Sequence, residues 1–120
     1  ESLNCIVLRK GRSTIISNPR HESEGSVIDA GTSWAATPGS GDVLSGITGA
    51  HLAHAAARWG NNAFLLDTQP VVIHALASAL AAQTDFGEAP ARALAIAKAV
   101  PAATAKLHQF SGLPAASTQR

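Results

Sequence analysis

Several residue types are scarce or missing in this chain of 120 residues. Methionine is absent even at position 1, so we expect the chain to be part of a longer gene product. Cys5 alone cannot form an internal disulfide, and the reducing cytoplasm is therefore the expected compartment. Charged residues make up 14% with a net charge of +1, which excludes an extended basic surface for nucleic acid. No apolar run reaches the roughly 20 residues of a membrane helix, so no membrane partner is expected.

Apolar residues make up 46% of the sequence, which suits one compact folded unit at this length. Two β-rich runs over 5–8 and 13–16 flank a turn with Gly11 and predict a hairpin. Cys5 would then be a small core residue of the first strand. Residues 17–25 have the composition of a loop, and a short extended piece over 26–28 follows.

Helices dominate the remainder of the chain. Apolar residues at helical spacing predict helices over 42–58, 70–83 and 90–110. Gly46 and Gly49 allow close backbone approach, so the first helix is expected to be buried on more than one side. Pro101 should divide the third region into two pieces, because proline removes a helical hydrogen bond. The small polar tail over 115–120 is expected to fray.

The segment Thr37-Pro-Gly-Ser-Gly-Asp-Val-Leu-Ser-Gly46 carries the clearest chemical signal. Gly39 and Gly41 bracket a turn that opens a helix, and both are expected to adopt backbone conformations that are forbidden to residues with a Cβ. Main-chain N–H groups at such a helix start bind phosphate oxygens. Asp42 has two interpretations. It could hold or deprotonate a hydroxyl that meets a phosphoryl group, or it could be a first-turn aspartate stabilised by the helix dipole. The residues alone leave both open.

Residues 37–46 are similar to the Gly-x-Gly-Asp anion-hole signature of ribokinase-like enzymes, in the form found in NAD(P)H-hydrate dehydratases. Residues 8–14 resemble that family's upstream Lys-Gly-x-x-Thr segment. Residues 107–113 resemble its late Leu-His-Gly helix, although Gln109 stands where glycine is usual. The close resemblance covers residues 5–56. It implies that 1–120 is the C-terminal portion of one ribokinase-like three-layer α/β domain, a β-hairpin followed by the anion-hole helix and further helices.

The resemblance also implies an activity, cofactor repair. The nucleotide, ADP or ATP as co-substrate, would phosphorylate the hydroxyl of the S-epimer of hydrated NADH or NADPH (NADHX or NADPHX), and loss of phosphate would restore the nicotinamide. Mg2+ would accompany the phosphates, and we expect a homo-oligomer. Asp42 would be catalytic and contact the substrate. The implied nucleotide-binding residues are Lys10, Gly11, Arg12, Ser13, Thr14 and Gly41, and the implied anion hole is Gly39, Ser40 and Gly41.

Two other classes of function stay open on the sequence. A ribokinase-like kinase for a vitamin precursor or sugar would use the same loop. The chain could also be an inactive fragment, or a small α-helical oligomerisation module with a vestigial nucleotide loop. The histidine pair His51 and His54 lacks a third metal ligand at suitable spacing, so no metal site is predicted in the protein. His21, His74 and His108 have no local catalytic partner. Trp34 could line the nucleotide pocket or pack on a helix.

Overall fold

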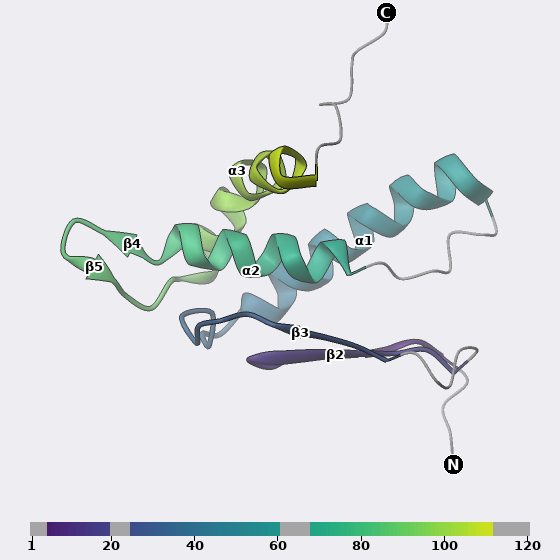
Figure 1. The fold of residues 1–120 in the computed structure, drawn as a ribbon, viewed down its shortest axis with the longest axis horizontal. Coiled ribbons are helices and arrows are strands. Elements are labelled where there is room, and N and C mark those ends of the chain that lie inside the picture. Colours follow the sequence, from purple (N-terminus) through teal and green to yellow (C-terminus); the bar gives the residue numbers. More distant parts are fainter. Residues whose placement is uncertain (1–4, 20–24, 61–67, 112–120) are drawn as a thin grey trace, which may run out of the picture.

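The computed structural model describes residues 5–19, 25–60 and 68–111 and has a mixed α/β fold (Figure 1). Its elements in chain order are β1 (Val7–Arg9), β2 (Ser13–Ser17), β3 (Ser26–Asp29), α1 (Ser40–Trp59), α2 (Gln69–Ala81), β4 (Gln83–Thr84), β5 (Gly87–Glu88) and α3 (Ala93–Ser111). The predicted order of a hairpin, the glycine-loop helix and further helices is confirmed. None of the described helices has the length and apolar character needed to span a membrane.

The first three strands form an antiparallel sheet in the order β1-β2-β3. Leu8 pairs with Ile16 and Thr14 pairs with Ile28, which confirms both the hairpin and the short third strand. Alternation along β2 buries Thr14 and Ile16. The expected core position of Cys5 is wrong, because β1 begins only at Val7 and Cys5 lies exposed before it.

The helices cover one face of this sheet, with α2 between the sheet and α3 (Figure 1). Ile16, Leu44 and Val71 form the core that joins the sheet to α1 and α2. A second core joins α2 to α3 through five buried residues, Ile73, Ala77, Ala91, Ile96 and Ala103. Of the predicted three-layer arrangement, the described elements therefore supply helices on a single side of the sheet.

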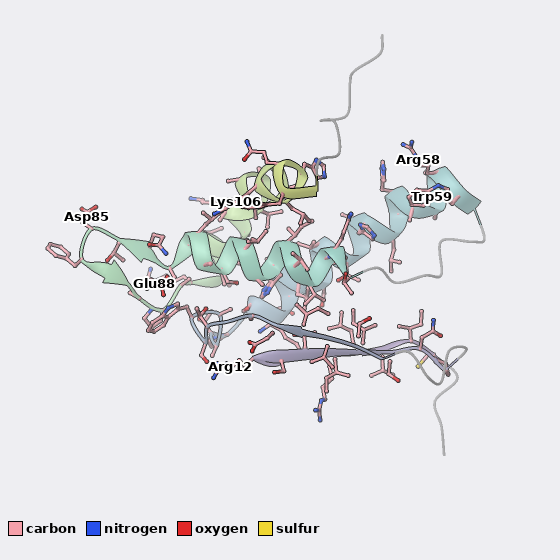
Figure 2. All side chains as sticks on the ribbon, viewed as in Figure 1. Arg12, Arg58, Trp59, Asp85, Glu88 and Lys106 are labelled. Atoms are coloured by element: carbon pink, nitrogen blue, oxygen red, sulfur yellow. The ribbon has the colours of Figure 1, made fainter. Side chains whose placement is uncertain are left out.

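Helix α1 begins at Ser40, within the predicted distance of Asp42. It was expected to be buried on more than one side, and this expectation is wrong. Its buried residues are Ser40, Leu44 and Ala55, which lie along one side, whereas Gly46 and Gly49 face open space. At its C-terminal end the Arg58 guanidinium lies 5.9 Å from the ring centre of Trp59, a pair that Figure 2 shows at the tip of the helix.

Helix α3 continues through Pro101 as one helix, so the prediction of two pieces is wrong. Proline removes the hydrogen bond to the carbonyl of Ala97, and both residues are exposed. Water can therefore satisfy the freed carbonyl, while Ile96 and Ala103 hold the helix against α2 from its other side. Helix α2 follows the prediction closely, with Pro70 in its first turn.

The hairpin of β4 and β5 was not predicted. The Thr84 hydroxyl donates to the carbonyl of Gly87 at 2.6 Å, and Gly87 has a φ of 116°, which closes the turn. Glu88 on this hairpin, labelled in Figure 2, accepts a 2.7 Å hydrogen bond from the indole of Trp34. Trp34 thus contacts this hairpin through its indole N–H, and it lines neither of the two cavities described below.

Some predictions concern residues outside the described ranges. These are part of the loop over 17–25, with His21, and the tail beyond residue 111.

Candidate functional site

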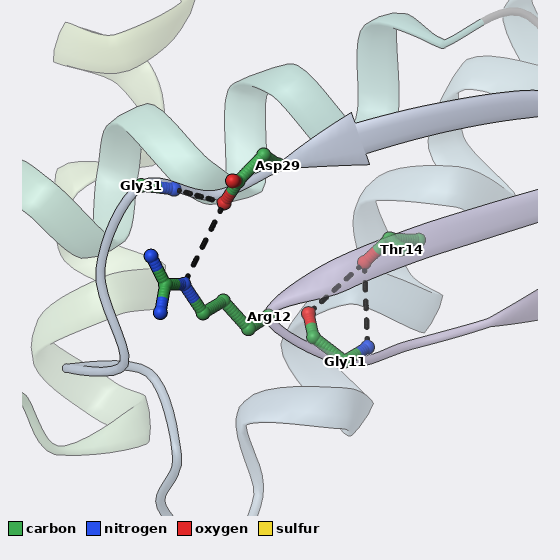
Figure 3. Close-up of polar contacts among 5 residues, drawn as sticks. All are labelled: Gly11, Arg12, Thr14, Asp29 and Gly31. Atoms are coloured by element: carbon green, nitrogen blue, oxygen red, sulfur yellow. Dashed lines mark hydrogen bonds and ion pairs between the residues drawn. The ribbon is translucent and has the colours of Figure 1, made fainter.

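The turn between β1 and β2 is closed by a threonine side chain (Figure 3). The hydroxyl of Thr14 donates to the carbonyl of Gly11 at 3.3 Å and accepts from its N–H at 3.4 Å. Thr14 is 4% exposed, because its side chain points into the helix-covered side of the sheet. The Lys-Gly-x-x-Thr spacing therefore has a local structural meaning: the threonine fixes the backbone that presents Lys10.

Arg12 is engaged with β3. Its Nε lies 3.8 Å from a carboxylate oxygen of Asp29, and the same oxygen accepts from the N–H of Gly31 at 2.8 Å (Figure 3). Both charged side chains are more than half exposed, so the ion pair itself contributes little stability. Its effect is to tie the turn to the start of the loop over 30–39. Gly31 has a φ of 74°, which redirects the chain toward α1.

The start of α1 lacks a side-chain cap. Gly39 occupies the N-cap position in the left-handed region, with φ 83°, and a Cβ there would lie 3.1 Å from the Cβ of Ala93. The Ser40 N–H donates to the carbonyl of Thr37 at 3.2 Å, and the Val43 N–H donates to Gly39 at 3.1 Å. Within the described ranges, no protein acceptor bonds the N–H groups of Gly41 and Asp42. These two donors are the ones available to an anion.

Gly39 and Gly41 differ in what they require. Both were expected to need unusual backbone conformations, which is correct for Gly39 and wrong for Gly41. Gly41 has no positive φ, and nothing lies within 4 Å of a Cβ placed on it. The fold therefore does not need glycine at position 41, and the absent side chain leaves its N–H open to a ligand. Asp42 is exposed on the same first turn.

Two cavities lie near the turn that carries Lys10, and one of them reaches the start of α1. A cavity of about 140 Å³ lies between the turn, the loop over 30–36 and α2, and its lining includes Lys10, Gly11, Arg12 and Thr14. An open groove of about 500 Å³ lies between β1 and α1, and its lining includes Leu8, Lys10, Gly41 and Ser45. The smaller space is below the roughly 300–1,000 Å³ of a complete ligand pocket, so it can receive only part of one ligand. Lys10 lines both spaces.

His74 is a residue that the sequence argument assigned no role. It is 5% exposed on α2, and its Nε2 lies 3.0 Å from the carbonyl oxygen of Ser40 and 3.1 Å from the hydroxyl. Burial lowers the pKa of His74 below its usual 6.5, the hydrogen bond to Ser40 opposes this shift, and the charge of Lys10 adds to it. The imidazole is therefore neutral near pH 7. The sequence feature that could have indicated this contact is a polar histidine within a largely apolar helix.

The remaining predicted residues are less closely grouped. Ser13 is exposed and lines neither cavity. The Ser40 side chain is fully buried against His74, so it faces away from any ligand at the helix start. His51 and His54 belong to no group of three metal-ligating side chains in the part of the chain that the structure describes.

The fold and this geometry define a mixed α/β protein in which a helix start with two open main-chain N–H groups lies beside a lysine-bearing turn. The sequence model of the NAD(P)H-hydrate dehydratase family matches residues 1–101. The chain belongs to this family. The match extends well beyond residues 5–56, to which the close resemblance was assigned, and it ends before the stretch over 107–113.

Curated relatives agree with the family. The chain is 45% identical to the bifunctional NAD(P)H-hydrate repair enzyme Nnr of Corynebacterium glutamicum, over 89% of this chain and 20% of that protein. Proteins of the same name from Mycobacterium tuberculosis and Mycobacterium leprae are 53% identical over 44% of this chain and 11% of their own length. The chain thus spans a fifth or less of the relatives it matches. No solved structure matches it significantly.

Proposed function

We propose that this chain supplies the nucleotide side and the catalytic carboxylate of an enzyme that dehydrates the S-epimer of hydrated NADH or NADPH. An adenine nucleotide, ADP or ATP, donates the phosphoryl group to the substrate hydroxyl, and loss of phosphate restores the nicotinamide. The family match favours this reaction over a sugar or vitamin kinase and over an inactive module. Assembly as a homo-oligomer and location in the cytoplasm accompany the proposal as predictions.

One observation carries the proposal: Lys10 and Gly41, which lie in separate sequence motifs, line the same groove. A phosphate seated there would meet a positive charge from the strand end and open N–H groups from the helix start. Each hydrogen bond to a charged group contributes about 1.5–3 kcal/mol, and the helix dipole adds about 0.3–1 kcal/mol. Together these contributions would make the groove a stronger anion site than either motif alone.

Asp42 is the carboxylate in position to act on the substrate. It is exposed at the first turn of α1, next to the open N–H of Gly41. A carboxylate beside phosphates is unfavourable unless it takes a proton or a hydroxyl hydrogen bond during transfer. We assign Asp42 the proton of the substrate hydroxyl, while the N–H groups of Gly41 and Asp42 stabilise charge on the transferring phosphoryl group.

Magnesium would accompany the phosphates and would be held mainly by phosphate oxygens and water. Protein-bound Mg2+ commonly takes one or two carboxylates together with phosphate oxygens and water. Neither cavity is lined by a carboxylate, which leaves Asp42 as the acidic side chain of the helix start. When bound, the ion would share the negative charge of the phosphates. Lys10 would do part of the same work from the protein.

The test is the activity of the complete enzyme with Asp42→Asn. We expect nucleotide-dependent conversion of hydrated NADH or NADPH to fall about 10²–10⁴-fold, the usual effect of a positioned general base. Nucleotide affinity and melting temperature should change little, because the amide has the same shape. A panel of sugars and vitamin precursors serves as the control for kinase activity. Near-normal turnover by the Asn variant would return Asp42 to a helix-start role.

A further inference from the structure

His74 on α2 is buried against the first turn of α1. Its Nε2 lies 3.0 Å from the main-chain oxygen of Ser40 and 3.1 Å from the Ser40 hydroxyl, and both side chains are buried. The two residues come from helices that are separate in the sequence. This contact is therefore a tertiary connection to the helix start, made by a side chain that the reaction itself does not use.

Hydrogen-bond chemistry determines which atom is the donor in this contact. A carbonyl oxygen only accepts, so a 3.0 Å contact with it requires that His74 Nε2 carries the proton. The opposite tautomer would place two acceptor atoms against each other. Nδ1 is then the unprotonated nitrogen of a neutral ring, and the Ser40 hydroxyl accepts from the same Nε2–H at 3.1 Å.

The helix start has few other supports. Gly39 offers no side-chain cap, and Gly41 has no side chain to pack. Ser40 lies between them and is held by its N–H to Thr37 and by its oxygens to His74. The position of Ser40 therefore determines where the open N–H groups of the next two residues point.

We propose that His74 is a positioning residue for the reaction: through Ser40 it fixes the N–H groups of Gly41 and Asp42 relative to the nucleotide. His74 also lines the small cavity together with Lys10 and Thr14. His74 thus lines the cavity on the proposed nucleotide side and also contacts Ser40 at the helix start. This inference rests on the proposed function for its kinetic consequence, whereas its structural consequence stands independently.

Three variants of the complete enzyme test the proposal. His74→Leu keeps the bulk and removes the donor. His74→Gln places an amide N–H near the position of Nε2 and is the conservative rescue. Ile73→Ala is the matched control, because Ile73 is buried on the same helix but packs in the core shared with α3. It should lower stability without touching Ser40.

Two measurements are made on each variant. For His74→Leu we expect kcat to fall about 10–100-fold with KM for the nucleotide within about threefold, since small misplacement of reacting groups acts mainly on turnover. Hydrogen exchange of the N–H groups over 39–43 should be faster. Glutamine should recover most of both losses. Ile73→Ala should keep the wild-type kcat and the wild-type local exchange.

The outcomes separate the two proposals. If the wild-type enzyme does not dehydrate hydrated cofactors, the proposed function fails, and the exchange measurement still decides whether His74 holds the helix start. Equal exchange over 39–43 in His74→Leu and Ile73→Ala would overturn the positioning role. So would a wild-type kcat in the leucine variant, or no recovery with glutamine.

Discussion

Replacing Gly41 with alanine should separate what the fold requires from what the ligand requires. Gly41 has an ordinary helical backbone, and a Cβ there would have no neighbour within 4 Å. Glycine within a helix costs about 0.5–1 kcal/mol relative to alanine, with the lower value expected in the first turn. We therefore expect the chain to gain about 0.5 kcal/mol of stability, or about 2 °C in melting temperature at this size.

Nucleotide binding should change in the opposite direction. The added methyl group would stand beside the open N–H of Gly41 and obstruct a phosphate oxygen there. Loss of one hydrogen bond to a charged group costs about 1.5–3 kcal/mol, which corresponds to a Kd about 10–150-fold weaker. Titration calorimetry of the complete enzyme with ADP and ATP measures this. Valine, which is β-branched, should weaken binding at least as much and also lose the gain in stability.

Gly46→Ala is the matched control for this experiment. Gly46 lies in the same helix, also faces open space and lines neither cavity. It should show an equal or larger gain in stability, up to about 1 kcal/mol, with unchanged nucleotide affinity. Normal nucleotide binding by Gly41→Ala would refute the placement of phosphate at this helix start, and a loss of stability would refute the description of its backbone.

Two further predictions concern the same region. Gly39→Ala should destabilise the chain by about 1–2 kcal/mol from its left-handed backbone alone. Combining it with Ala93→Gly removes the Cβ that would lie 3.1 Å away, and this should relieve only the destabilisation that the close contact adds, as measured by chemical denaturation. Full recovery of stability would contradict the backbone argument. Because the pKa of His74 is lowered on folding, its contribution to stability is complete above pH 6.5 and is lost as the pH falls below this value toward the folded-state pKa. The contribution of His74 to the slope should be at most about 1.4 kcal/mol per pH unit, and it should vanish in His74→Gln.

Local sequence patterns predicted the elements that depend on interactions between residues close together in the sequence. The β-rich runs around Gly11 gave the hairpin, and the glycines before Asp42 gave the start of α1. Three errors came from tertiary context. Pro101 lies on the exposed side of α3, where water replaces the lost hydrogen bond, and Cys5 precedes a strand of only three residues. The short hairpin of β4 and β5 is held by turn contacts and by Trp34, which lies far away in the sequence.

The candidate site was predictable in part for the same reason. Motif spacing brought attention to Lys10, Gly41 and Asp42, and the groove shared by Lys10 and Gly41 could only be seen in the structure. His74 escaped notice because its partner, Ser40, lies on another helix and because its own neighbours in sequence are apolar. The sequence suggested an unusual backbone conformation at Gly41, and this was wrong because a glycine in a sequence does not determine its φ angle.

The central position of α2 limits which substitutions this helix tolerates. It packs against the sheet through Val71 and against α3 through Ile73 and Ala77, while His74 meets α1. Ala77 is completely buried in the core shared with α3, so this position has no room for a larger side chain, whereas Ser78 lines the small cavity. Extra methylene groups in such a place cost about 1–3 kcal/mol through overpacking. Substitution at Ala77 is therefore restricted by an upper limit on side-chain size, whereas the other alanines of α2 are partly exposed.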